Sequence, residues 1–199
     1  MVPEGLWEQL DKLDRQKTAE RAKCRFLANP PRYAISLLNT EYMVDLSDKQ
    51  IFSNQPGLEP TEAEFLEQLC ILAYLINAQD LPPANKFVGP EHLPSGQFFF
   101  RGLHSLPTEK LEEAFGKSPE RLYEVSKKLD ANRSEFGDAS IEFYALPRIP
   151  ITIIIWRGDD EFEARASILF DETASNQLPL DALGALANLA VKALLEASE

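Results

Sequence analysis

The chain has 199 residues and a formal net charge of −12, with 44% hydrophobic and 26% charged residues. This length and balance are typical of one globular domain, or of one domain with an appendage. The negative charge argues against binding to a nucleic-acid backbone, because that affinity comes mainly from lysines and arginines that neutralise phosphates.

Two features of the sequence indicate where the protein works. Cys24 and Cys70 form no Cys-x-x-Cys pair, which argues against a zinc site, a thiol redox motif or an all-cysteine iron–sulfur cluster. The first residues carry mixed charges and no apolar signal-peptide core, and no apolar run approaches the roughly 20 residues of a membrane helix. We therefore expect a cytoplasmic protein with free thiols, no membrane segment and no nucleic-acid partner.

Residues 4–29 are predicted to form one helix. Leu6, Leu10 and Leu13 recur at helical spacing, and the following stretch RQKTAERAK is polar on all sides. Such a helix could lie on the surface or contact a partner. We therefore divide the chain into two parts, an N-terminal helix at 1–30 and an α+β domain at 31–199. The helix could be an appendage or a homodimer contact.

The next segments change from helical spacing to alternation and back. Residues 34–38, 42–46 and 50–53 have the composition of short strands separated by polar turns, which predicts an antiparallel meander. Thr61 and Glu64 match a capping box that would open a helix over 61–79. This helix is apolar on nearly every side from Leu69 onward, which predicts a buried central helix.

A long connection follows at residues 80–106, rich in proline and glycine and containing both histidines. Loops of this length are uncommon in compact domains and are often functional. Phe98, Phe99 and Phe100 cannot all remain in water, so at least two should pack in a short strand or anchored turn.

The C-terminal half is predicted to contain helices, then strands, then a helix. Helices are expected at 107–115 and 118–132, the second with Ser118 as cap and Pro119 at its first position. Three strands are expected from the segments SIEFYAL, PITIIIW and EARASILF, and a last helix at 179–197. PITIIIW is apolar on both faces and should be the central strand, followed by a hairpin at RGDDEFE.

Several side chains in this half are candidates for a site. Arg101, His92 and His104 of the long loop could bind an anionic ligand or a metal, or could simply order the loop. Arg148, between two prolines, could grip a ligand carboxylate, or an internal partner such as Asp171 or Glu142.

The acidic turn after PITIIIW is a weaker candidate. Asp159, Asp160 and Glu161 could hold a metal ion, but their spacing is not that of an EF-hand loop. A catalytic carboxylate pair and a solvated hairpin tip are the other readings. The sequence contains neither a Gly-x-Ser-x-Gly nor a Gly-x-Gly-x-x-Gly motif.

The run from LPRIP through WRGDDEF to LFD and LPL, preceded by FFFRGLHSLPTEKLEEAFGKSPERL, resembles a prokaryotic family of unknown function, domain of unknown function 3786, over about residues 60–197. The resemblance supplies no activity. Some members of that family carry a cysteine-rich, iron–sulfur-like segment ahead of this domain. Because this chain has only two cysteines, the resemblance implies no electron-transfer role here and leaves any cofactor unknown.

These observations predict a single α+β domain in which a mainly antiparallel sheet packs against helices. We expect a prokaryotic, non-enzymatic binding or accessory protein, whose 80–106 loop and Arg148 region bind a small anionic ligand, a cofactor or a partner. One alternative is an enzyme that uses His104 with Asp159, Asp160 or Asp171. Another is a structural interaction module with an exposed apolar face on the helix at 4–29.

Overall fold

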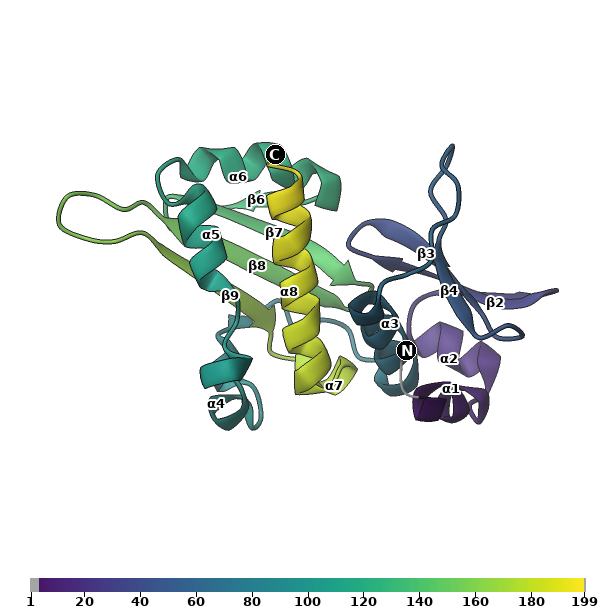
Figure 1. The fold of residues 1–199 in the computed structure, drawn as a ribbon. Coiled ribbons are helices and arrows are strands. Elements are labelled where there is room, and N and C mark those ends of the chain that lie inside the picture. Colours follow the sequence, from purple (N-terminus) through teal and green to yellow (C-terminus); the bar gives the residue numbers. More distant parts are fainter. Residues whose placement is uncertain (1–3, 199) are drawn as a thin grey trace.

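The computed structural model describes residues 4–198 and confirms the α+β fold, with two antiparallel sheets side by side (Figure 1). The first sheet contains, in spatial order, β1 (Arg25–Ala28), β2 (Pro31–Leu37), β3 (Thr40–Asp45) and β4 (Gln50–Ser53). The second contains, in spatial order, β5 (Phe87–Val88), β9 (Arg165–Asp171), β8 (Ile149–Trp156), β7 (Ala139–Leu146) and β6 (Asn132–Ser134). The predicted meander is therefore confirmed, and it has one strand more than expected.

The single helix predicted at 4–29 is wrong. The segment forms α1 (Glu4–Asp11), α2 (Arg15–Arg21) and the extra strand β1. Asp14 starts a new helix because its side chain accepts a hydrogen bond from the Lys17 N–H at 2.8 Å. Lys23 then adopts a left-handed conformation, with φ of 52°, which ends α2 and turns the chain into β1.

The central helix is confirmed as α3 (Phe65–Asn77), but the cap predicted at Thr61 is wrong. Thr61 is held by the first sheet instead, because its carbonyl accepts a hydrogen bond from the Ser53 N–H at 2.8 Å. The Glu67 carboxylate reaches back to the Glu64 N–H at 2.7 Å and so caps the first turn. In Figure 1, α3 lies between the two sheets.

The second sheet is built around the strand that the sequence placed at its centre. Every residue of β8 from Ile149 to Ile155 is buried, and β7 and β9 flank it on either side. In Figure 1, α5 (Thr108–Phe115) and α8 (Leu180–Glu196) lie over one face of this sheet, and the connection from β8 to β9 projects away from the body. A short helix, α7 (Ala174–Gln177), precedes α8.

The helix predicted at 118–132 is broken. It consists of the 3-10 turn Pro119–Arg121, helix α6 (Leu122–Val125) and the 3-10 turn Ser126–Leu129. Pro119 does occupy the first position, but the Ser118 side chain makes no capping hydrogen bond. Asp130 adopts a left-handed conformation, with φ of 52°, and the chain then enters β6 as an edge strand of the sheet.

The long connection is compact rather than irregular. After β5 it contains the 3-10 turn Pro90–His92, helix α4 (Gly96–Phe99) and the 3-10 turn Gly102–His104. Gly96 is required here, because a Cβ atom would lie only 1.9 Å from the Pro90 carbonyl oxygen.

Two of the three phenylalanines pack, as predicted. Phe100 stacks on Phe170 of β9 with ring centroids 6.4 Å apart, and Phe99 contacts Phe100 edge-on at 5.1 Å. The Phe98 side chain is 72% exposed. Among the described residues, no helix combines the length and the hydropathy that crossing a bilayer requires.

Candidate functional site

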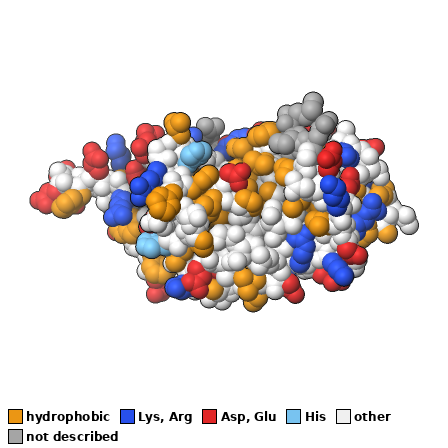
Figure 2. Space-filling model, turned by 90° about the horizontal axis from the view of Figure 1, so that it is seen from below, with side chains coloured by type: hydrophobic (Ala, Val, Ile, Leu, Met, Phe, Trp, Pro, Cys, Tyr) orange, Lys and Arg blue, Asp and Glu red, His pale blue; other side chains and the backbone are white. Residues whose placement is uncertain are grey.

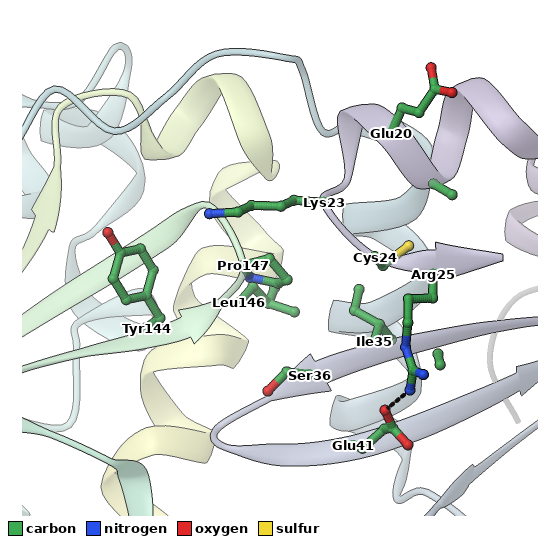
Figure 3. Close-up of a pocket in the computed structure, with 12 residues that line it drawn as sticks. Glu20, Lys23, Cys24, Arg25, Ile35, Ser36, Glu41, Tyr144, Leu146 and Pro147 are labelled. Atoms are coloured by element: carbon green, nitrogen blue, oxygen red, sulfur yellow. Dashed lines mark hydrogen bonds and ion pairs between the residues drawn. The ribbon is translucent and has the colours of Figure 1, made fainter.

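The ends of β2 and β7 bring the two sheets together. The Leu38 N–H, directly after β2, donates to the Ala145 carbonyl of β7 at 2.9 Å. Beyond this contact the two strands diverge and leave a groove of about 640 Å³ (Figure 3). Its polar lining residues are Glu20, Lys23, Arg25, Ser36, Glu41 and Tyr144. Such a hollow between two packed units is a common place for a ligand site.

The charges in this groove are unevenly paired. Arg25 and Glu41 form an ion pair across one end, and Asn54 also donates to the Glu41 carboxylate at 2.8 Å. Lys23 is exposed and makes no ion pair with any residue that the structure describes. Figure 3 shows its side chain extended across the groove toward Tyr144. Glu20 also lines the groove and forms no ion pair with a described residue, but Figure 3 shows its carboxylate directed away from Lys23 and Tyr144. Among the described residues, Lys23 therefore supplies the groove with an ammonium group that has no ion-pair partner.

Cys24 also lines the groove, but its thiol is poorly suited to nucleophilic chemistry. Burial raises the pKa of Cys24 to about 12, and the nearby Arg21 lowers it only in part. The thiol therefore stays protonated at neutral pH, whereas the thiolate is the reactive form.

Arg148 follows Leu146 and Pro147, which line the groove, and has internal partners. Its Nε donates to the Arg21 carbonyl at 2.7 Å, and its guanidinium pairs with Asp80. The Tyr74 hydroxyl donates to the next carbonyl, Ala22, at 3.1 Å. These bonds satisfy carbonyl groups left free at the end of α2. Arg148 thus fixes the β7–β8 turn, which carries the lining residues Leu146 and Pro147, against the end of α2. Its internal ion-pair partner is Asp80, whereas the sequence had suggested Asp171 or Glu142.

The start of the 80–106 loop is held by two buried polar side chains, Asp171 and Gln177, both 0% exposed. Gln177 accepts from the Gln79 N–H at 2.9 Å and donates to the Leu81 carbonyl at 3.1 Å. Asp171 accepts from the N–H groups of Ala84, Lys86 and Thr173, and from the Thr173 hydroxyl at 2.6 Å. Loop geometry here is therefore set by hydrogen bonds from the end of β9 and from α7.

These hydrogen bonds decide the charge state of Asp171. Burial alone would raise the pKa of this carboxyl group, but the bonds from Thr173, Ala84 and Lys86 outweigh burial and lower the pKa below its usual value. Asp171 is therefore an ionised structural anchor with its oxygen atoms already engaged.

The three candidates on the long loop are all exposed and do not converge on one cleft. His92 Nδ1 lies 3.1 Å from the Glu91 carboxylate, and His104 stacks on Phe99 with ring centroids 4.8 Å apart. Figure 2 shows both histidines on one face of the molecule, separated by other side chains. Within residues 4–198, His104 makes no hydrogen bond or ion pair with Asp159, Asp160 or Asp171, and Arg101 makes no ion pair. The pairing that the enzyme alternative requires is not formed.

The acidic hairpin tip forms its own turn. The Asp159 side chain accepts hydrogen bonds from the N–H groups of Glu161 and Phe162, both at 2.8 Å, and these bonds lower the pKa of Asp159. In the part of the chain that the structure describes, no group of three or more His, Cys, Asp or Glu side chains is placed to hold a metal ion. The geometry gives Asp159 the role of a turn-former.

Sequence reasoning missed the main residues of the groove. Lys23 fell inside the single helix predicted at 4–29, where a polar surface needs no special explanation. Tyr144 lies on the outward side of its strand and is 51% exposed. An exposed aromatic ring in the otherwise regular alternation of SIEFYAL was the one available signal for it.

Comparison with known proteins places the chain in a family. The sequence profile described as Domain of unknown function (DUF3786) matches residues 14–193, so the match starts well before the region of the resemblance and includes both sheets. No curated protein and no solved structure gives a significant match. The chain therefore belongs to the family described as Domain of unknown function (DUF3786).

Proposed function

We propose that this protein is a non-enzymatic, cytoplasmic binding or accessory protein of a prokaryotic cell, and that it binds a small anionic ligand in the groove between its two sheets. The observation that carries the proposal is Lys23, whose ammonium group extends into a hollow of about 640 Å³ without an ion-pair partner among the described residues. An unpaired cation in a concave site attracts an anion and raises its local concentration.

The other lining residues define the class of ligand. Tyr144 supplies a ring face, Ser36 supplies a hydroxyl group, and Ile35 and Leu146 supply apolar surface. A carboxylate or phosphate attached to a planar or apolar body matches this set. Such a ligand would pair its anion with Lys23 and place its body against Tyr144.

Two observations support binding rather than catalysis. The pKa of the Cys24 thiol is raised to about 12, so this thiol is held in its unreactive form. The groove also lacks a histidine, and neither His92 nor His104 lines it. A rigid wall fixed by Arg148 is consistent with a preformed binding site.

The proposal is tested by titration calorimetry with paired anions: acetate against benzoate, and inorganic phosphate against phenyl phosphate. We expect the aromatic member of at least one pair to bind more tightly. Lys23→Gln should weaken that binding about tenfold, which corresponds to the loss of one charged contact.

Lys17→Gln is the matched control, because Lys17 lies on α2, is exposed and does not line the groove. It should bind like the wild type. Absence of binding by all four anions, or equal affinity in the Lys23→Gln variant and the wild type, would refute the proposal.

A further inference from the structure

The outer edge of β9 is only partly paired with another strand. Strand β5 pairs with it through two residues, Phe87 opposite Asp171 and Val88 opposite Phe170. No strand pairs with the outer edge of the remaining residues, Arg165–Leu169, within residues 4–198. An uncovered strand edge presents a row of backbone donors and acceptors to any chain that approaches it.

The backbone groups that face this edge can be assigned from two hydrogen bonds. The Glu172 N–H donates outward to the Lys86 carbonyl at 2.9 Å, and the Ala166 N–H donates outward to Glu112 Oε1, also at 2.9 Å. Alternate residues of a strand direct their N–H and C=O groups to the same edge. Ile168, which lies between them in a regular register, therefore directs its N–H and C=O groups outward as well.

A groove of about 270 Å³ runs along this edge. Its other walls come from the long connection and the start of α5, including Gly89, Pro90, Phe100, Ser105, Leu106 and Thr108. The groove exists because the chain leaves the sheet at Gly89 and turns into the 3-10 helix that begins at Pro90, which has no N–H to donate.

We propose that this edge binds an extended peptide segment of a partner protein, which continues the line of β5 and pairs antiparallel with residues 165–169 of β9. Backbone hydrogen bonds to Ile168 and Ala166 supply the affinity, as in other cases where a strand is added to a sheet. The side chains on either face of the edge then determine which peptides fit.

The edge itself specifies the partner's chemistry. Arg165 is exposed, lies over the Trp156 ring at 5.5 Å and makes no ion pair with a described residue, so the peptide residue opposite it should be acidic. Ser167 calls for a polar residue and Leu169 for an apolar one. Ala166 and Ile168 are buried, and the residues opposite them point toward Phe100 and must be apolar.

Glu112 already occupies part of this position. Its carboxylate accepts the Ala166 N–H at the place where a partner-strand carbonyl would accept it. It acts as an internal substitute that satisfies the edge while the groove is empty, and an arriving peptide must displace it. Removal of this side chain should therefore favour the peptide.

The direct test uses the peptide Val-Ala-Thr-Val-Glu-Gly, acetylated at its N-terminus and labelled with fluorescein at its C-terminus, and fluorescence anisotropy with the full chain. Its Ala-Thr-Val-Glu core would lie opposite residues 168 to 165 in that order, and its first valine would reach Leu169, next to the position opposite Phe170 that Val88 holds. N-methylation of the peptide alanine removes the N–H that faces Ile168 and should weaken binding at least tenfold. N-methylation of the threonine, whose N–H faces away from β9, should preserve it.

Protein variants provide independent controls. Glu112→Ala should bind the peptide several-fold more tightly, and Glu113→Ala, an exposed glutamate on the same helix, should bind it as the wild type does. Arg165→Ala should weaken binding of this peptide and leave a peptide with glutamine in place of glutamate unaffected. Lys23→Gln should have no effect, which separates this surface from the groove between the sheets.

Three results would overturn the inference. These are no binding of the unmethylated peptide, equal loss of affinity from both N-methylations, or a wild-type dimer in light scattering that the peptide dissociates. The last result would assign the edge to a second copy of this chain in place of a different partner.

Discussion

At the scale of single residues, Asp171 shows how a buried charge can be structural. Its side chain is 0% exposed and accepts four hydrogen bonds, which connect the end of β9 to the start of the long loop. The cost of burying a carboxylate is offset because every bond comes from a donor fixed by the backbone or by Thr173. The sequence alone suggested Asp171 as a catalytic partner of His104 or as the ion-pair partner of Arg148, and it serves neither.

Asp171→Asn should lower the free energy of unfolding by about 2 kcal/mol at pH 7. Hydrogen bonds to a charged oxygen are replaced by weaker bonds to a neutral one. The new amide N–H₂ group also faces donors, with which it cannot form hydrogen bonds. Amide hydrogen exchange at Ala84 and Lys86 should accelerate in the variant. Gln16→Ala, at an exposed side chain of α2, provides a reference that should change neither quantity. Unchanged exchange at both amides would show that Asp171 does not hold the loop.

The contribution of Asp171 to the free energy of unfolding depends on pH in a definite direction. Because the pKa of Asp171 is lower in the folded chain than the value of about 4 in an unfolded one, its stabilising effect is complete above that value. The effect is lost as the pH falls through the folded-state pKa. In urea titrations, the stability difference between wild type and Asp171→Asn should therefore shrink as the pH is lowered below about 4. A constant difference over this range would contradict the assignment.

At the scale of elements, the sequence predicted best where one strong pattern acts alone. β8 was identified because the segment PITIIIW is apolar on both strand faces, and the structure buries all seven residues from Ile149 to Ile155. The helix at 4–29 failed because its apolar spacing is interrupted by two local signals, the cap at Asp14 and the left-handed Lys23. The left-handed conformation of Lys23 cannot be predicted from its residue type, since this conformation is rare for residues other than glycine. The groove was missed for the same reason, because it depends on where that turn directs Lys23.

The start of α3 provides a test at this scale. Glu67→Ala should lower the free energy of unfolding by about 1–2 kcal/mol, because the Glu64 N–H loses its cap and the Tyr42 hydroxyl loses its acceptor at 2.7 Å. Thr61→Ala, which would remove the cap expected from the sequence, should cost less than about 0.5 kcal/mol. Urea denaturation of both variants decides between the two caps, and a larger loss for Thr61→Ala would mean that the helix starts earlier than at Phe65.

At the scale of the whole molecule, the N-terminal segment is part of the core. Trp7 and Leu10 are 6% and 2% exposed, and Ala19 and Ala22 are buried with them. The apolar face that the sequence offered as a contact for a partner is thus covered by the chain itself. A homodimer through residues 4–29 remains a prediction, and it would have to use the polar side of these helices.

Trp7→Ala should therefore destabilise the chain by about 3 kcal/mol, since it leaves a large cavity next to α3. The variant's mass in light scattering should equal that of the wild type. Leu27→Ala, at a side chain 40% exposed on β1, should cost less than about 1 kcal/mol. A Trp7→Ala variant that keeps its stability but has half the wild-type mass would instead place Trp7 in a dimer interface.

The contact between Leu38 and Ala145 has a consequence for how the chain folds. The first sheet is assembled from neighbouring segments and can form early, whereas the groove is complete only after β7, more than 100 residues later, has docked beside β2. The same holds for the bond from Arg148 to the Arg21 carbonyl. A ligand in this groove would select chains in which both sheets are docked, and would slow their separation without changing the rate at which either sheet forms.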